Sequence, residues 1–196
     1  MRVPKRLLGG IPCLDFANST SRIKSMSSEG WELLVAWTQG QGLTNEIETQ
    51  RLLREGKANP SDRERVLARA ASLGTAMGSL FRAVAEQSPP PPADLARLNL
   101  EMAALFSTSR LEPAGAVYRW AWAREPLERI LYPILRSACD LLTSSELSHV
   151  RICEAETCNW VFLDTTKNRS RRWCDMRSCG NREKMKRYRL RKRRSA

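Results

Sequence analysis

Cys153-Glu-Ala-Glu-Thr-Cys158 is followed, after fifteen intervening residues, by Cys174-Asp-Met-Arg-Ser-Cys179. Two short-spaced cysteine pairs supply the four thiolates that a tetrahedral structural zinc site requires, and the intervening segment brings the two loops together. A module this small cannot bury a large apolar core, so the metal must supply much of its folding free energy. The spacing therefore predicts a zinc finger with Zn2+ as its cofactor. The expected ligands are Cys153, Cys158, Cys174 and Cys179.

Closely spaced cysteines also have other uses in proteins. Two disulfides would suit a small secreted domain, and four thiolates also suit an iron–sulfur cluster or redox-active thiols. The first ten residues contain no apolar run of signal-peptide length, and no stretch approaches the roughly 20 apolar residues of a membrane span. We therefore expect a cytoplasmic protein, in which thiols stay reduced and clustered cysteines bind metal. Cys13 and Cys139 have apolar neighbours and are expected to pack as small hydrophobic side chains.

Positive charge is concentrated in the same C-terminal quarter. The chain has a net charge of +12, and residues 151–196, with 15 Lys and Arg against 5 Asp and Glu, contribute +10 of it. A charge confined to one small module is typical of a surface that binds a polyanion such as nucleic acid. Too few apolar residues lie there for a lipid-buried face, so we expect no membrane partner. The residues expected to contact phosphate lie between the cysteine pairs and on a basic helix from about Asn181 to Arg193: Lys167, Arg169, Arg171, Arg172, Arg182, Lys184, Lys186, Arg187, Arg189, Arg191 and Lys192.

The residues around the second cysteine pair match a known motif. Trp173-Cys-Asp-Met176 followed by Cys179-Gly-Asn-Arg182 resembles the CGNR zinc finger, and segments 153–164 and 168–172 match the same pattern in order and spacing. The N-terminal part is similar to the ABATE domain that usually precedes this finger, through Cys13-Leu-Asp-Phe-Ala-Asn18 and segment 31–42. The resemblance implies a bacterial regulator of stress-induced transcription, with an N-terminal sensing or assembly domain and a finger that binds DNA.

Helical periodicity dominates the first 145 residues. The segment from Pro60 to Gln87 is expected to form a long helix, because its apolar residues recur at steps of three or four. Ser61 and Glu64 have the spacing of a capping box at its start. Shorter helices are expected at 33–37, 44–55, 93–105 and 125–143.

Strand patterns are short. The alternation in Val117–Trp122, with Pro113-Ala-Gly115 before it, predicts a small β-hairpin within residues 107–123, and short strands are expected at 147–152 and 160–163. The expected fold class is therefore mainly α: a helical N-terminal domain with a β-hairpin at 1–145, and a four-cysteine zinc finger ending in a basic helix at 146–196. We expect each domain to have its own source of stability.

Signatures of catalysis are missing from the sequence. It has no Gly-rich phosphate loop and no Gly-x-Ser-x-Gly elbow, and its single histidine, His149, is expected to be structural. Because four cysteines would close the coordination shell of zinc, we do not expect an enzyme. Asp15 and Asn18, with Arg22 nearby, could line a polar pocket for a small-molecule ligand of unknown identity, although Asp15 fits a cap or a turn equally well.

The sequence thus predicts a transcription regulator whose finger docks on the phosphate backbone of double-stranded DNA. An RNA-binding zinc module is an alternative, because phosphate affinity does not distinguish the two nucleic acids. A protein-interaction module that grips an acidic partner is another. Trp160 and Trp173 are expected to cover the thiolates. The sequence does not indicate an oligomeric state.

Overall fold

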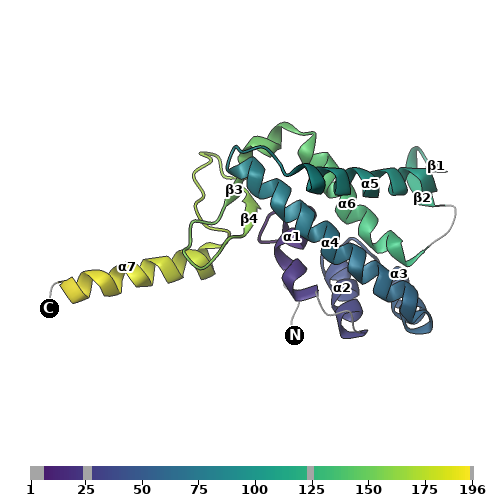
Figure 1. The fold of residues 1–196 in the computed structure, drawn as a ribbon, viewed down its shortest axis with the longest axis horizontal. Coiled ribbons are helices and arrows are strands. Elements are labelled where there is room, and N and C mark those ends of the chain that lie inside the picture. The colour runs from purple at the N-terminus through teal and green to yellow at the C-terminus, as the bar shows by residue number, and fades with distance from the viewer. Residues whose placement is uncertain (1–6, 24–27, 123–125, 195–196) are drawn as a thin grey trace.

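The computed structural model of the 196-residue chain describes residues 7–23, 28–122 and 126–194. Six helices form one body, and a small lobe connects this body to a seventh helix that projects from it (Figure 1). The expected fold class is confirmed, since the body is mainly helical and a cluster of four cysteines precedes the last helix. The helices are α1 (Pro12–Ile23), α2 (Ser28–Gly40), α3 (Glu46–Ala58), α4 (Pro60–Ala85), α5 (Pro92–Thr108), α6 (Tyr132–Leu142) and α7 (Asn181–Arg194).

The described strands form two antiparallel pairs. In the first, β1 (Ser109–Ala114) pairs with β2 (Val117–Trp122), and Leu111 lies opposite Trp120. Gly115 lies in the turn with a φ of +68°, a conformation that glycine adopts without strain. The expected hairpin is therefore confirmed. In the second pair, β3 (Val150–Ile152) lies beside β4 (Val161–Leu163) in the small lobe.

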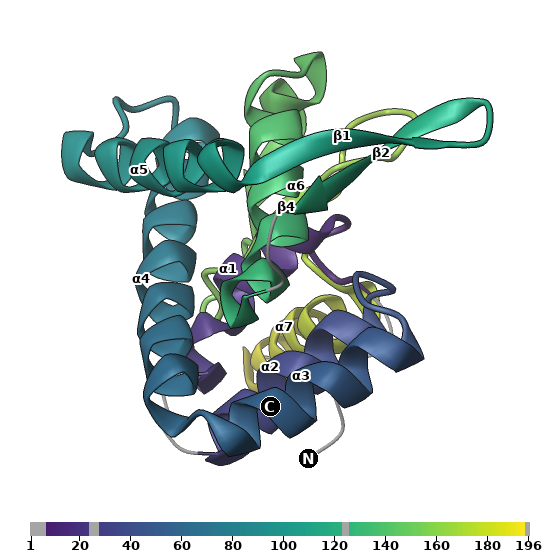
Figure 2. The ribbon, with the colours of Figure 1, turned by 90° about the vertical axis from the view of Figure 1, so that its right-hand side faces the viewer.

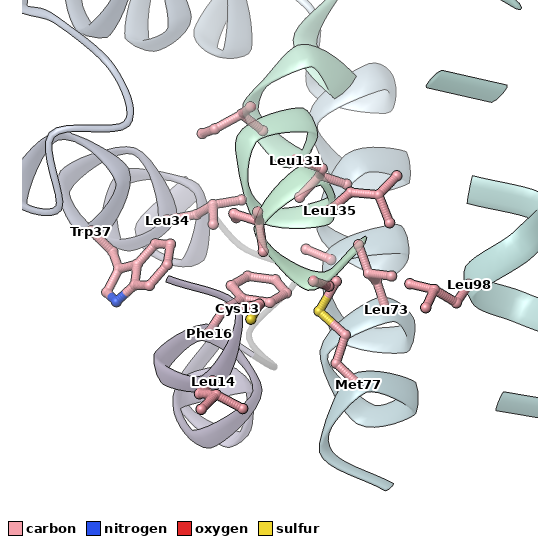
Figure 3. Close-up of a cluster of buried hydrophobic side chains, with 14 of the residues drawn as sticks. Cys13, Leu14, Phe16, Leu34, Trp37, Leu73, Met77, Leu98, Leu131 and Leu135 are labelled. Carbon is pink, nitrogen blue, oxygen red and sulfur yellow. The ribbon is translucent and has the colours of Figure 1, made fainter. Parts of the chain in front are cut away.

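Helix α4 runs through the middle of the helical body. Leu73 and Met77 of this helix lie between Phe16 of α1 and Leu98 of α5, and all four side chains are buried (Figure 3). Cys13 is also fully buried, and burial raises the pKa of its thiol to about 12. Its expected role as a small hydrophobic side chain is therefore confirmed.

Three predictions about the helices need correction. Helix α1 was not expected, because its second half, Asn18-Ser-Thr-Ser-Arg22, is polar and shows no apolar periodicity. Ser61 does not cap α4: the helix begins at Pro60, and Asn59 is the cap residue. The single helix expected at 125–143 is instead a 3-10 turn, η1 (Leu127–Leu131), followed by α6, whose first turn contains a proline.

Ion pairs with buried carboxylates fasten α5 and η1 to α4. Glu101 of α5 accepts hydrogen bonds from Arg69 at 2.5 Å and from Arg97 at 2.7 Å. Glu128 of η1 pairs with Arg65 at 2.9 Å. A buried carboxylate without a partner would be strongly destabilising, so these pairs fix the orientation of α5 and η1 against α4.

The β3–β4 hairpin belongs to two cores at once. Val150, Val161 and Leu163 join the main core of the helical body, whereas Phe162 packs among the cysteines. The edge of β4 is completed by α1, because the Asn18 side chain donates to Val161 O at 2.8 Å and accepts from Val161 N at 3.0 Å. The hairpin is common to both parts, so we now expect the helical body and the finger to stabilise each other.

Candidate metal centre and nucleic-acid interface

Four cysteine sulfurs converge between the β3–β4 hairpin and α7. Their Sγ atoms all lie within 4.8 Å of one another, with Cys158 and Cys174 3.8 Å apart and Cys174 and Cys179 3.6 Å apart. Sulfurs of a tetrahedral zinc site, each about 2.3 Å from the metal, stand about 3.8 Å apart. A disulfide would hold its sulfurs at about 2.05 Å, and all four cysteines, including Cys153, are free thiols. The geometry therefore fits Zn2+ and excludes the disulfide alternative.

Local structure presents each thiol to the site. Cys153 directly follows β3, and its N–H donates to Trp160 O at 2.8 Å across the hairpin. Cys158 closes a tight turn by donating from its N–H to Ala155 O, also at 2.8 Å. Cys179 lies in a π-helical turn, η3 (Met176–Gly180), that leads directly into α7. The metal ligands thus connect the hairpin to the basic helix.

The pKa values of the cysteine thiols determine how many protons zinc must displace when it binds. Burial and the neighbouring cysteines raise the pKa of Cys158 to about 11, and the same causes raise the pKa of Cys174. For Cys153, burial favours the neutral thiol, but hydrogen bonds from the backbone of Cys174 and Ala155 and from the side chains of Cys158 and Cys174 together outweigh burial, so the pKa of Cys153 is lowered. Zinc binds thiolates, so binding must displace the remaining protons, and zinc affinity is expected to fall as the pH falls.

The segment from Cys179 to Arg182 supports the metal ligands. Arg182 Nη2 lies 3.3 Å from Cys179 Sγ, where its positive charge favours the thiolate. A side chain at position 180 would require the exposed Met176 side chain to move aside. Asn181 Nδ2 donates to Arg177 O at 3.2 Å and closes the η3 turn.

Two tryptophans border the metal centre. Trp160 and Trp173 are partly buried and pack against the cluster of cysteines and Phe162. Their expected position over the thiolates is therefore confirmed.

Arg171 does not lie where a phosphate could reach it freely. Its guanidinium stacks over the Phe162 ring at 4.5 Å, and it donates to Trp173 O at 2.9 Å, to Leu8 O at 3.0 Å and to Cys174 O. These bonds tie the finger to the start of the helical body. Arg171 is therefore a structural residue, and we withdraw it from the expected phosphate contacts.

The other basic residues between the cysteine pairs are exposed to different degrees. Arg172 pairs with Glu154 at 2.5 Å, and Arg169 lies 3.6 Å from Glu146. Lys167 is exposed. The basic residues between the cysteine pairs therefore offer fewer unpaired positive charges than the sequence alone indicates.

Helix α7 carries the exposed basic residues. It extends away from the helical body (Figure 1), and near its start it contacts the finger: Lys186 pairs with Glu156, and Glu183 accepts from the backbone N–H of Glu156 at 3.3 Å. Arg177, on η3, is also exposed, although a lone basic residue between two ligands gives no sequence signal. The expected contacts that the structure leaves exposed on α7 are Arg182, Lys184, Lys186, Arg187, Arg189, Arg191 and Lys192.

The carboxylate of Asp15 is held by backbone donors within the chain. The Asp15 carboxylate accepts hydrogen bonds from Leu8 N and Gly9 N, both at 2.9 Å, and burial raises its pKa to about 6. Asn18 is bonded to Val161, as described above for the edge of β4. These residues join the helical body to the finger, which favours the structural role of Asp15 over a role in a ligand pocket. The side chain of Arg22 lies outside the described residues.

Two further observations concern His149 and the length of the apolar helices. His149 lies 3.4 Å from Glu146, away from the four sulfurs that form the metal cluster. Among the helices described, none combines the length and apolar character needed to cross a bilayer.

Comparison with protein families agrees with this geometry. Residues 149–192 match the CGNR zinc finger, and residues 10–145 match ABATE, a family described as "Putative stress-induced transcription regulator". A search of curated proteins finds no match. The first match contains all four cysteines and most of α7, and the second covers more than half of the chain. The chain therefore belongs to the ABATE family and carries a CGNR zinc finger whose four cysteines form its zinc site.

Proposed function

We propose that this protein is a transcription regulator whose zinc finger binds double-stranded DNA through α7. The observation that carries the proposal is the 14-residue helix itself, which holds a single acidic residue, Glu183, and whose residues 184–192 are all exposed. A helix so densely charged repels itself in isolation, and phosphates would neutralise it. Lys186 pairs with Glu156 of the finger, and the basic side chains from Arg187 to Lys192 are exposed.

The shape of α7 suits a groove. Its 14 residues span about 21 Å, and the major groove of B-DNA is wide enough to admit an α-helix. Met185, Tyr188 and Leu190 are exposed among the basic residues and are candidates for apolar contacts with base edges. Basic residues would then position the helix on phosphates, whereas a few other side chains would read sequence.

Zinc has a structural role in this proposal. Four sulfurs complete a tetrahedral shell and leave no position for a substrate, so we propose a protein without catalytic activity. The metal fixes Cys179 and thereby the direction in which α7 leaves the finger. A regulator of this kind would act on DNA in the bacterial cytoplasm during the stress response that the family description names.

The proposal is tested by fluorescence anisotropy with a labelled DNA duplex and the full zinc-loaded chain. The double change Arg187→Gln and Arg189→Gln should weaken binding about tenfold or more, because it removes two phosphate contacts. The matched control, Arg54→Gln with Lys57→Gln, removes two exposed charges from α3, at the other end of the molecule (Figure 1), and should leave affinity unchanged.

Competition separates the alternatives. Unlabelled duplex DNA should displace the label at lower concentration than double-stranded RNA or poly-glutamate does. Preferential displacement by RNA would replace the DNA proposal with an RNA-binding module. Displacement by poly-glutamate alone would favour an acidic protein partner.

A further inference from the structure

A cavity of about 340 Å3 lies where the β1–β2 hairpin, α5, α6 and the loop between α2 and α3 meet. Figure 2 shows the hairpin passing beside α6. The apolar part of the lining includes Leu43, Leu105, Trp120, Tyr132 and Cys139. Cavities of about 300 to 1,000 Å3 with mostly apolar walls and a few polar groups are typical of small-molecule sites.

Two arginines of this cavity differ in their partners. Arg129 pairs with Glu48 at 3.4 Å, and both side chains are largely buried, so its charge is neutralised within the wall. Arg136 stands over the Trp120 ring, with its guanidinium carbon 5.6 Å from the ring centroid. Its ion pair with Asp140 spans 3.7 Å, which is too long for a hydrogen bond.

An incoming anion can easily replace Asp140 as the partner of Arg136. Their side chains are 56% and 71% exposed, and exposed ion pairs contribute little to stability. An anion entering the cavity could therefore take the N–H donors of Arg136 at small cost. Guanidinium groups bind carboxylates and similar planar anions in a bidentate geometry.

We propose that this cavity binds a small aromatic anion. The flat apolar body of the ligand lies against Trp120 and Tyr132, and its carboxylate or sulfonate group pairs with Arg136. Aromatic rings favour offset or edge contacts with the ligand ring, and the guanidinium supplies the charge selectivity. This inference does not depend on nucleic-acid binding, because none of the residues that line the cavity lies in the finger or on α7.

The test uses two fluorescent probes and the full zinc-loaded chain. The probes are 8-anilinonaphthalene-1-sulfonate, an aromatic anion, and N-phenyl-1-naphthylamine, which has the same rings without the sulfonate. The wild-type chain should bind the anionic probe saturably, at one site. Changing Arg136→Met should weaken the anionic probe about tenfold and leave the neutral probe nearly unchanged, because only the charged contact is lost.

Two further variants complete the design. Arg54→Met, an exposed residue of α3 outside the cavity, should change neither probe. Cys139→Phe, which fills part of the cavity, should weaken both probes, and circular dichroism establishes whether this variant is folded. If it is not folded, the Arg136→Met comparison decides alone. Equal binding of both probes by the wild-type chain, or anionic-probe affinity that Arg136→Met leaves unchanged, would overturn the proposal.

Discussion

At the scale of single residues, Asn18 connects parts of the chain that are far apart in sequence. Its carboxamide makes two hydrogen bonds with the backbone of Val161, 143 positions away, in the way a neighbouring strand would. Asn is suited to this position because its side chain offers a donor and an acceptor side by side, like a peptide group. One side chain of α1 therefore completes the edge of the hairpin on which the metal ligands depend.

Replacing Asn18 with Ala is expected to destabilise the whole chain. The change leaves the N–H and C=O of Val161 without partners at a partly buried edge, which costs about 1 to 3 kcal/mol in the free energy of unfolding. Urea denaturation of the zinc-loaded chain measures this difference. The matched control is Asn99→Ala on the exposed face of α5, for which we expect a change of less than about 0.5 kcal/mol. An equal effect of the two substitutions would contradict the role assigned to Asn18.

At the scale of elements, the β3–β4 hairpin has both faces covered. All three residues of β4 are buried, because Val161 and Leu163 face the helical body while Phe162 faces the cysteines. A hairpin of three-residue strands is not stable alone in water. It therefore needs the helical body on one side and the zinc site on the other.

Removing zinc is expected to lower the melting temperature of the helical body as well as of the finger. Because a loss of 1 kcal/mol shifts the melting temperature by about 2 to 4 °C in a chain of this size, the Cys174→Ser variant should melt at least about 5 °C below the wild type when followed by helical circular dichroism. Cys139→Ser, a change at a cysteine outside the metal cluster, is the control. A helical body that melts at the same temperature with and without zinc would show that the two parts are independent.

At the scale of the whole molecule, local patterns in the sequence predict more than long-range contacts do. The four metal ligands, the long helix α4 and the β1–β2 hairpin were all predictable, because each is specified by spacing within a short segment. Helix α1 was not predictable, because it is stabilised by its contacts with α4 and β4 and its own sequence lacks helical periodicity. Arg171 looked like a phosphate ligand because a sequence shows charge but not the carbonyl groups that surround it.

The position of the cavity could not be predicted from the sequence either. Its walls come from four segments between Leu43 and Asp140, none of which has a ligand-binding motif. Asp15 and Asn18 were expected to line a polar pocket because they are polar residues among apolar neighbours, but in the structure their hydrogen bonds join the helical body to the finger. The β1–β2 hairpin, which contributes Ser109 and Trp120 to the cavity, lies at the end of the molecule opposite to α7 (Figure 1).

The central claim is that the exposed charge of α7 binds DNA phosphates, and the salt dependence of binding tests it most directly. The exposed basic residues of α7 would engage about six phosphates, so log K should fall with log salt at a slope of about −5. In the variant with Arg187→Gln and Arg189→Gln the slope should be about −3, whereas the α3 control with Arg54→Gln and Lys57→Gln should keep the wild-type slope. Binding without salt dependence, or one slope shared by all three proteins, would contradict the account.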